Sequence, residues 1–262
     1  MQQVTRKTLG AGINLTCVTT PKFKRAVLRA MLVLPLGGED AALRACLPQV
    51  LRRGTARLND MQAFGTALDE LYGARIEAAV RKEGENLCIG FLSDCIDEAY
   101  APGADGLTAG VIGLLCDLLY NPYLQDGLFC AAYVEGERGN LIDRIAALKN
   151  DPRSWAPRRL NELMCENEDY GKSALGTIEQ AERITPETLY AAYRRALVNG
   201  WRTMLDDPLT LERYWMGQAA AGTLVSPEER IEQVTDITRE QVIAAAQSTA
   251  LDTVFFMKGA AK

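Results

Sequence analysis

The sequence predicts a helix-rich α+β fold in which an antiparallel sheet is backed by helices. Aromatic residues make up only 7% of the chain while alanine and leucine are abundant, which favours helices over a sandwich of many short strands. Apolar runs bounded by Gly and Pro are typical of strands in the N-terminal part. After Gly106, apolar residues recur at helical spacing. Together these observations predict a sheet followed by helices.

The N-terminal part is expected to supply the sheet and two helices. Strands are predicted at 13–19 and 26–34, where Gly and Pro bound the apolar runs. Helices are predicted at 40–53, ended by Gly54, and at 60–71, ended by Gly73. Two further strands are expected at 75–81 and 87–92.

Helices are expected to dominate the remainder. Their predicted ranges are 107–119, 125–148 after the Asn121-Pro122 break, 153–165, and 186–198 with Thr185 as the N-cap. Farther along, Ser226 and Glu229 have the spacing of a capping box. The segment 251–257 has the pattern of a strand.

Charge and hydropathy exclude two classes of partner. The formal charge is −5, from 29 basic and 34 acidic residues that are interspersed without a basic block, so no nucleic acid is expected. No apolar stretch approaches the roughly 20 residues that span a bilayer, so no membrane is expected. The first residues lack the apolar region of a signal peptide, which predicts a cytoplasmic location.

The residues that could act as a nucleophile, an acid or a base show no spacing typical of a catalytic site. The seven cysteines are scattered without a C-x-x-C spacing and are expected to be reduced and mostly buried. The chain has no histidine, so Ser-His-Asp and Cys-His arrangements are excluded. Carboxylates such as Glu135 and Glu137 stand two apart and point to different faces of a helix, which favours charged surface over a catalytic dyad. No catalytic residue is therefore predicted.

Several short segments resemble, in order, the insulinase-type or inverzincin metallopeptidases. They are Leu51-Arg52-Arg53-Gly54-Thr55, Leu68-Asp69-Glu70-Leu71-Tyr72-Gly73-Ala74, Asn121-Pro122, Glu135-Gly136-Glu137-Arg138, Tyr170-Gly171-Lys172, Thr185-Pro186-Glu187-Thr188-Leu189-Tyr190 and Leu205-Asp206-Asp207-Pro208. Within the family the chain is most similar to a non-catalytic bacterial member linked to aminopentanol modification of elongation factor P. The resemblance implies an antiparallel sheet with helices and a partner subunit.

The resemblance also implies where a zinc site would lie. Active members carry H-x-x-E-H ahead of the Gly-Thr turn, where two histidines bind zinc and the glutamate activates water. Counting back from Gly54 places Ala45 and Gln49 at the histidine positions and Pro48 at the glutamate position. Glu137 matches the distal zinc ligand, and Arg144 stands in place of its companion. The sequence therefore predicts no metal and no cofactor, and a solvated helix-face role for Glu137.

The domain organisation is expected to be abridged relative to the family. Residues 1–198 resemble the first α+β domain, and residues 199–262 resemble a remnant of the second. An internal deletion is expected near Val198 to Trp201, where the closing strand of the first domain is missing.

Three functions remain open from the sequence. The favoured one is a non-catalytic partner or scaffold subunit for another insulinase-family chain, as a homo- or hetero-oligomer, with a peptide in the vestigial cleft as a further ligand. The partner would act in peptide processing or elongation factor P modification. The alternatives are a zinc-dependent peptidase with an unrecognised site and a plain binding or structural module.

Overall fold

The structure is a computed structural model that describes residues 3–10, 13–36, 40–84, 86–101, 103, 105–205, 225, 226 and 229. Its central element is an antiparallel sheet with strand order β3-β5-β4, formed by β3 (Arg25–Pro35), β5 (Asn86–Ile96) and β4 (Arg75–Glu83). Phe91 of β5 stands opposite Ala30 of β3 and Ala78 of β4 and is fully buried. The four predicted strands and the α+β class are confirmed.

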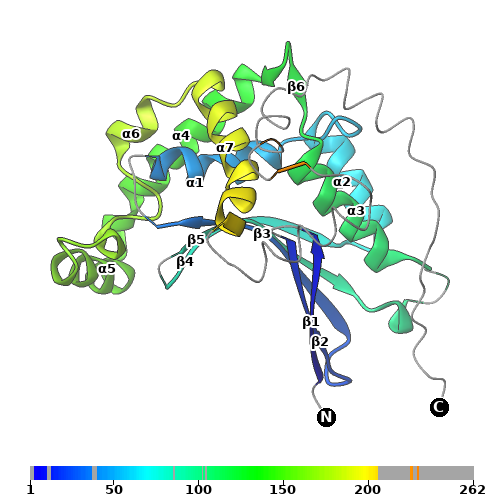
Figure 1. Cartoon of the computed structure of the whole chain (residues 1–262). Helices are drawn as coiled ribbons and strands as arrows, with labels where there is room; N and C mark the ends of the chain where they lie inside the picture. Colours follow the sequence, from blue (N-terminus) through cyan, green and yellow to red (C-terminus); the bar gives the residue numbers. More distant parts are fainter. Residues whose placement is uncertain are drawn as a thin grey trace.

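Strands β1 (Gln3–Gly10) and β2 (Ile13–Thr19) form a separate antiparallel hairpin. Figure 1 shows this hairpin extending away from the sheet, on the side opposite α1, α4 and α7. Every residue of β2 is exposed. The hairpin therefore contributes little to the core of the domain.

The helices supply the second layer. Their bounds are α1 (Ala41–Leu51), α2 (Met61–Glu70), α3 (Leu107–Tyr120), α4 (Ala131–Ala147), α5 (Pro152–Met164), α6 (Ile178–Glu182) and α7 (Pro186–Leu205), with 3-10 turns at Glu98–Tyr100, Leu148–Asn150 and Asp169–Gly171. Helix α1 packs against α4, α6 and α7 above the sheet (Figure 1). Among the described helices, none is long and apolar enough to cross a membrane.

The core lies between the sheet and these helices. Its largest fully buried side chains include Leu47 of α1, Phe64 of α2, Phe91 of β5 and Leu118 of α3. Helix α7 contributes Leu189, which is also completely buried. Apolar burial on this scale is the main stabilising term of such a domain. The core therefore ties α7 to the N-terminal sheet.

The prediction of one helix over 125–148 is wrong at its start. Residues Leu124–Gln125 (β6) and Leu128–Phe129 (β7) form a short hairpin, and α4 begins only at Ala131. Asp126 and Gly127 both have positive φ, as the two-residue turn of a tight hairpin requires. The Asp-Gly turn signal overrides the apolar periodicity at this point.

The C-terminal predictions fall largely outside the described residues. Helix α7 is continuous from Pro186 to Leu205, so the expected domain boundary after residue 198 lies within a helix. The capping box is confirmed at the residues that can be seen, because the Ser226 N–H donates to the Glu229 carboxylate and the Glu229 N–H donates to the Ser226 hydroxyl. Apart from residues 225, 226 and 229, the predicted remnant domain beyond residue 205, with the strand at 251–257, lies outside the described residues.

Candidate functional site

The positions at which the resemblance predicts H-x-x-E-H lie on α1, which is buried around most of its circumference. Ala45 and Pro48 are fully enclosed, and Gln49 is half-buried. Cys46 and Leu47 on the same turn are buried as well. A methyl group, a pyrrolidine ring and an uncharged amide provide none of the imidazole or carboxylate ligands that zinc requires. The residues present do not fit a zinc ion.

Glu137 lies on α4, which packs against α1. Only 8% of the residue is exposed, so the prediction that it is a solvated surface acid is wrong. The guanidinium of Arg53 donates to the Glu137 carboxylate over 2.6 Å from Nε, and the amide of Asn140 donates to the other oxygen over 3.1 Å. A buried carboxylate needs such a compensating charge and hydrogen bonds.

Arg53 therefore supplies the positive charge next to this buried carboxylate. It follows α1 and precedes the Gly54-Thr55 turn, one helical turn beyond Gln49. The guanidinium fork can satisfy a carboxylate with directional hydrogen bonds, so this carboxylate has a cationic partner without a metal. Sequence reasoning did not identify Arg53 or Asn140 as partners of Glu137. Arg53 lies in the Leu51–Thr55 motif, but no pattern in the sequence predicts a contact between two residues that are 84 positions apart.

The Cys46 thiol on α1 interacts electrostatically with this carboxylate. Burial, with a smaller contribution from the negative charge of Glu137, raises the pKa of Cys46 to about 12. The thiol is therefore protonated at neutral pH, and neither a thiolate ligand nor a thiolate nucleophile forms there. No group of three His, Cys, Asp or Glu side chains that could hold a metal occurs among the described residues.

Arg144, the residue in place of the distal glutamate's companion, is exposed in the last turn of α4. A cation there is favourable next to the carbonyl end of the helix. The structure thus packs α1, which carries Ala45, Pro48 and Gln49, against α4, which carries Glu137, while Arg144 is exposed.

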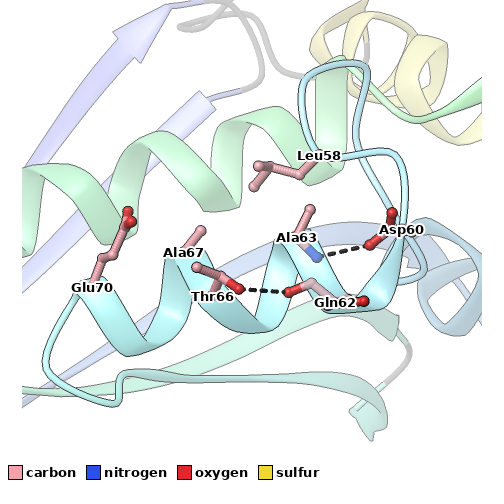
Figure 2. A pocket seen from close by; sticks show the side chains of 7 residues that line it. All are labelled: Leu58, Asp60, Gln62, Ala63, Thr66, Ala67 and Glu70. Atoms are coloured by element: carbon pink, nitrogen blue, oxygen red, sulfur yellow. Dashed lines mark hydrogen bonds between the residues drawn. The ribbon is translucent and has the colours of Figure 1, made fainter.

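A separate hollow of about 530 Å³ runs beside α2. Figure 2 shows its lining, with Asp60 at one end of the helix and Glu70 at the other. The Asp60 carboxylate accepts the Ala63 N–H as the N-cap of α2, and the Thr66 hydroxyl donates to the Gln62 carbonyl. Asp60 and Thr66 thus make these hydrogen bonds within α2 and its N-cap. None of the five positions predicted from the resemblance lines it.

Known proteins that are similar to this chain include two named as metalloprotease or zinc protease, one of them as inactive. No protein-family model matches the chain. The chain is 33% identical over 191 residues to a Bacillus subtilis protein named "Probable inactive metalloprotease YmfF". The matched region covers 73% of this chain and 45% of that protein. The chain is 24% identical over 195 residues to an uncharacterized zinc protease from Streptomyces coelicolor, of which it covers 38%. The chain thus matches less than half the length of these relatives.

The fold is shared with solved structures. A conserved protein from Enterococcus faecalis superposes with a TM-score of 0.68 at 22% identity, over 74% of this chain and 46% of that one. A peptidase M16 inactive domain from Pseudomonas fluorescens superposes with a TM-score of 0.54 at 14% identity, over 73% of this chain and 43% of the other. The ordered motifs, the similarity to the probable inactive metalloprotease and this fold together support an inactive member of the insulinase-type (M16) metallopeptidase family.

Proposed function

We propose that this chain is a non-catalytic partner subunit that associates with another insulinase-family chain. The observation that carries the proposal is the Arg53–Glu137 pair. In the segment where the family binds zinc, a guanidinium lies on the one remaining carboxylate, and Ala45 and Pro48 are enclosed by neighbours. A domain built this way has no metal to polarise a peptide carbonyl or to activate water.

The partner subunit would bind through exposed apolar surface rather than through the predicted zinc site. Large apolar side chains are exposed on the β1–β2 hairpin and along α5, where Leu160, Leu163 and Met164 recur at helical spacing. Exposed apolar patches of this kind mark association surfaces in proteins of ordinary composition. A partner that covers them would bury surface that the described residues leave open.

The enclosed zinc position argues against a peptide bound at that point. A peptide in the vestigial cleft would need space next to Ala45, Pro48 and Glu137, and all three are buried. This observation favours association through other surfaces, and it is also what supports the second candidate, a plain structural module without a ligand. A zinc peptidase with an unrecognised site has no comparable support.

Location and pathway are part of the same proposal. The seven cysteines are all free thiols, which fits a reducing compartment such as the cytoplasm. A role beside an active paralogue in peptide processing, or in elongation factor P modification, rests on the family resemblance. The partner is expected to be a chain that retains H-x-x-E-H.

The test combines metal analysis with size-exclusion chromatography. We expect purified protein to contain far less than one zinc per chain by mass spectrometry, and to co-elute with a family member that retains H-x-x-E-H. Stoichiometric zinc would contradict the loss of the site. Zinc-free protein that stays separate from the active homologue would leave the plain module.

A further inference from the structure

Helix α5 presents apolar side chains to solvent and charged side chains to its own domain. Arg158 and Glu162 lie on its inner side, each with about a quarter of its side chain exposed, and form an ion pair there. The Arg158 guanidinium also donates to the Ser173 hydroxyl. The outer face consists of exposed apolar residues at helical spacing: Ala156, Pro157, Leu160, Leu163 and Met164. A surface helix normally shows the reverse pattern, so this face is suited to contact with another protein surface.

The hollow beside α2 offers small side chains that complement this face. Figure 2 shows Ala63 and Ala67 one turn apart on the same side of α2, with Leu58 next to them. Helices pack when large side chains of one fit between the side chains of the other, and alanine leaves room for this. Figure 1 shows α5 at one end of the domain and α2 toward the other, so the two surfaces can meet only between chains.

The charges of the two helices are also complementary. The last turn of α2 contains Asp69 and Glu70 and no basic residue, and Glu70 lines the hollow. The first turn of α5 contains Arg153 and no acidic residue, and Arg153 lies two turns before Leu160 on the outer face. Both charges oppose the dipole of their own helix, which is negative at the C-terminus and positive at the N-terminus. An antiparallel contact that pairs Arg153 with Glu70 would compensate both.

We infer that the outer face of α5 in one copy of the chain docks antiparallel along the α2 hollow of a second copy, with Arg153 against Glu70. This inference rests on the proposed role as a partner subunit and names the surfaces. At about 1.5 Å per residue, the hollow from Asp60 to Glu70 is about 15 Å long. The outer face from Arg153 to Met164 is about 16 Å long, so the two surfaces match in length.

The contact is reciprocal, because every copy carries one outer face and one hollow. Exchange of the two surfaces about a two-fold axis closes a dimer with two identical helix contacts. Each contact is smaller than a standard interface of at least about 1,200 Å², so the dimer is weak and depends on concentration.

The test is sedimentation velocity of the full chain at about 0.15 M salt, over about a hundredfold range of concentration. Wild type is expected to shift from monomer to dimer. Glu70→Arg and Arg153→Glu are each expected to raise the dissociation constant at least about tenfold, because like charges would then face each other. Each substitution improves the charge placement on its own helix, so the variants should melt no lower than wild type and the loss of dimer cannot be unfolding.

The two charge reversals should rescue each other. A chain that carries both substitutions, and an equal mixture of the two single variants, should dimerise like wild type. Asp69→Arg is the matched control, because it makes the same charge change in the same turn but does not line the hollow, and it should dimerise like wild type. Leu160→Ser should raise the dissociation constant at least about tenfold by removing buried apolar surface from the contact. Equal dissociation constants for Glu70→Arg and Asp69→Arg, or a double variant no tighter than the single ones, would overturn the inference.

Binding of an active homologue separates this inference from the proposed function. A wild type that stays monomeric but binds the H-x-x-E-H paralogue, with Arg153→Glu and Leu160→Ser binding equally well, would keep the proposed function and overturn this inference. A dimer that responds to the charge reversals but does not bind the paralogue would support this inference and remove the expected partner.

Discussion

Arg53 and Glu137 decide the character of the site at the scale of single residues. The carboxylate is buried on α4 and the guanidinium reaches it from the end of α1, so each depends on the other. Removing one partner leaves a buried charge or an unsatisfied donor, which costs more than the intact pair contributes. The pair is thus a structural link between α1 and α4, at the place where the resemblance predicts a zinc site.

Arg53→Met is expected to lower the free energy of unfolding by about 2 kcal/mol, because it leaves the Glu137 carboxylate without its cation. Glu137→Leu alone should also destabilise. The double variant should lose less than the two single losses added together, since no buried charge remains. Urea denaturation of the four proteins measures this coupling.

Arg144→Met is the control for that cycle. Arg144 is exposed on the same helix, and its loss should change stability by no more than about 0.5 kcal/mol. Strict additivity of Arg53→Met and Glu137→Leu would contradict an energetic role for the pair.

Cys46 gives a prediction about pH. Burial and the Glu137 charge raise its pKa from 9.0 to about 12, so the folded chain keeps a proton that the unfolded chain releases. This contribution to stability is complete below pH 9 and is lost as the pH rises toward 12. At pH 8 we expect iodoacetamide to modify the exposed Cys17 but not Cys46, as read by peptide mass spectrometry. Modification of both thiols at equal rates in the folded protein would contradict the burial.

The β3–β5 pairing depends on Gly90 at the scale of the elements. Gly90 has φ of 152°, and a Cβ atom there would collide with the carbonyl oxygen of Ala30 on the neighbouring strand. A side chain must push β3 and β5 apart, because the clash is with backbone rather than with a flexible side chain. The close approach therefore requires glycine.

Gly90→Ala should destabilise the domain by about 2–4 kcal/mol through this clash and the unfavourable φ. Gly113→Ala is the matched control, because a Cβ atom at Gly113 meets nothing within 4 Å on α3. That substitution should be neutral or stabilise by up to about 1 kcal/mol, since alanine favours helix. Thermal unfolding followed by circular dichroism distinguishes the two, and equal melting temperatures would refute the close-approach argument.

The whole molecule is expected to be indifferent to zinc. A ligand that binds only the folded state raises its stability in proportion to the logarithm of its concentration over its dissociation constant. With no ligand cluster in the described part and Glu137 held by Arg53, neither zinc nor a chelator should move the melting temperature. A rise of several degrees with zinc in a thermal-shift assay would reveal a site elsewhere in the chain. An H-x-x-E-H homologue measured in parallel serves as the positive control.

The α+β class, the four strands and most helix positions could be predicted from the sequence alone, and the prediction that Ala45, Pro48 and Gln49 stand at zinc-ligand positions follows from the resemblance. Periodicity, turn residues and side-chain chemistry are local properties, so they can be predicted along the chain. The tertiary structure decided what local patterns cannot express. It buried Glu137 and paired it with Arg53, which lies 84 residues away, and it began α4 six residues later than predicted, after the Asp126-Gly127 turn. Burial and ion pairing depend on which surfaces meet in space, and only packing of α1 against α4 brings those two charges together.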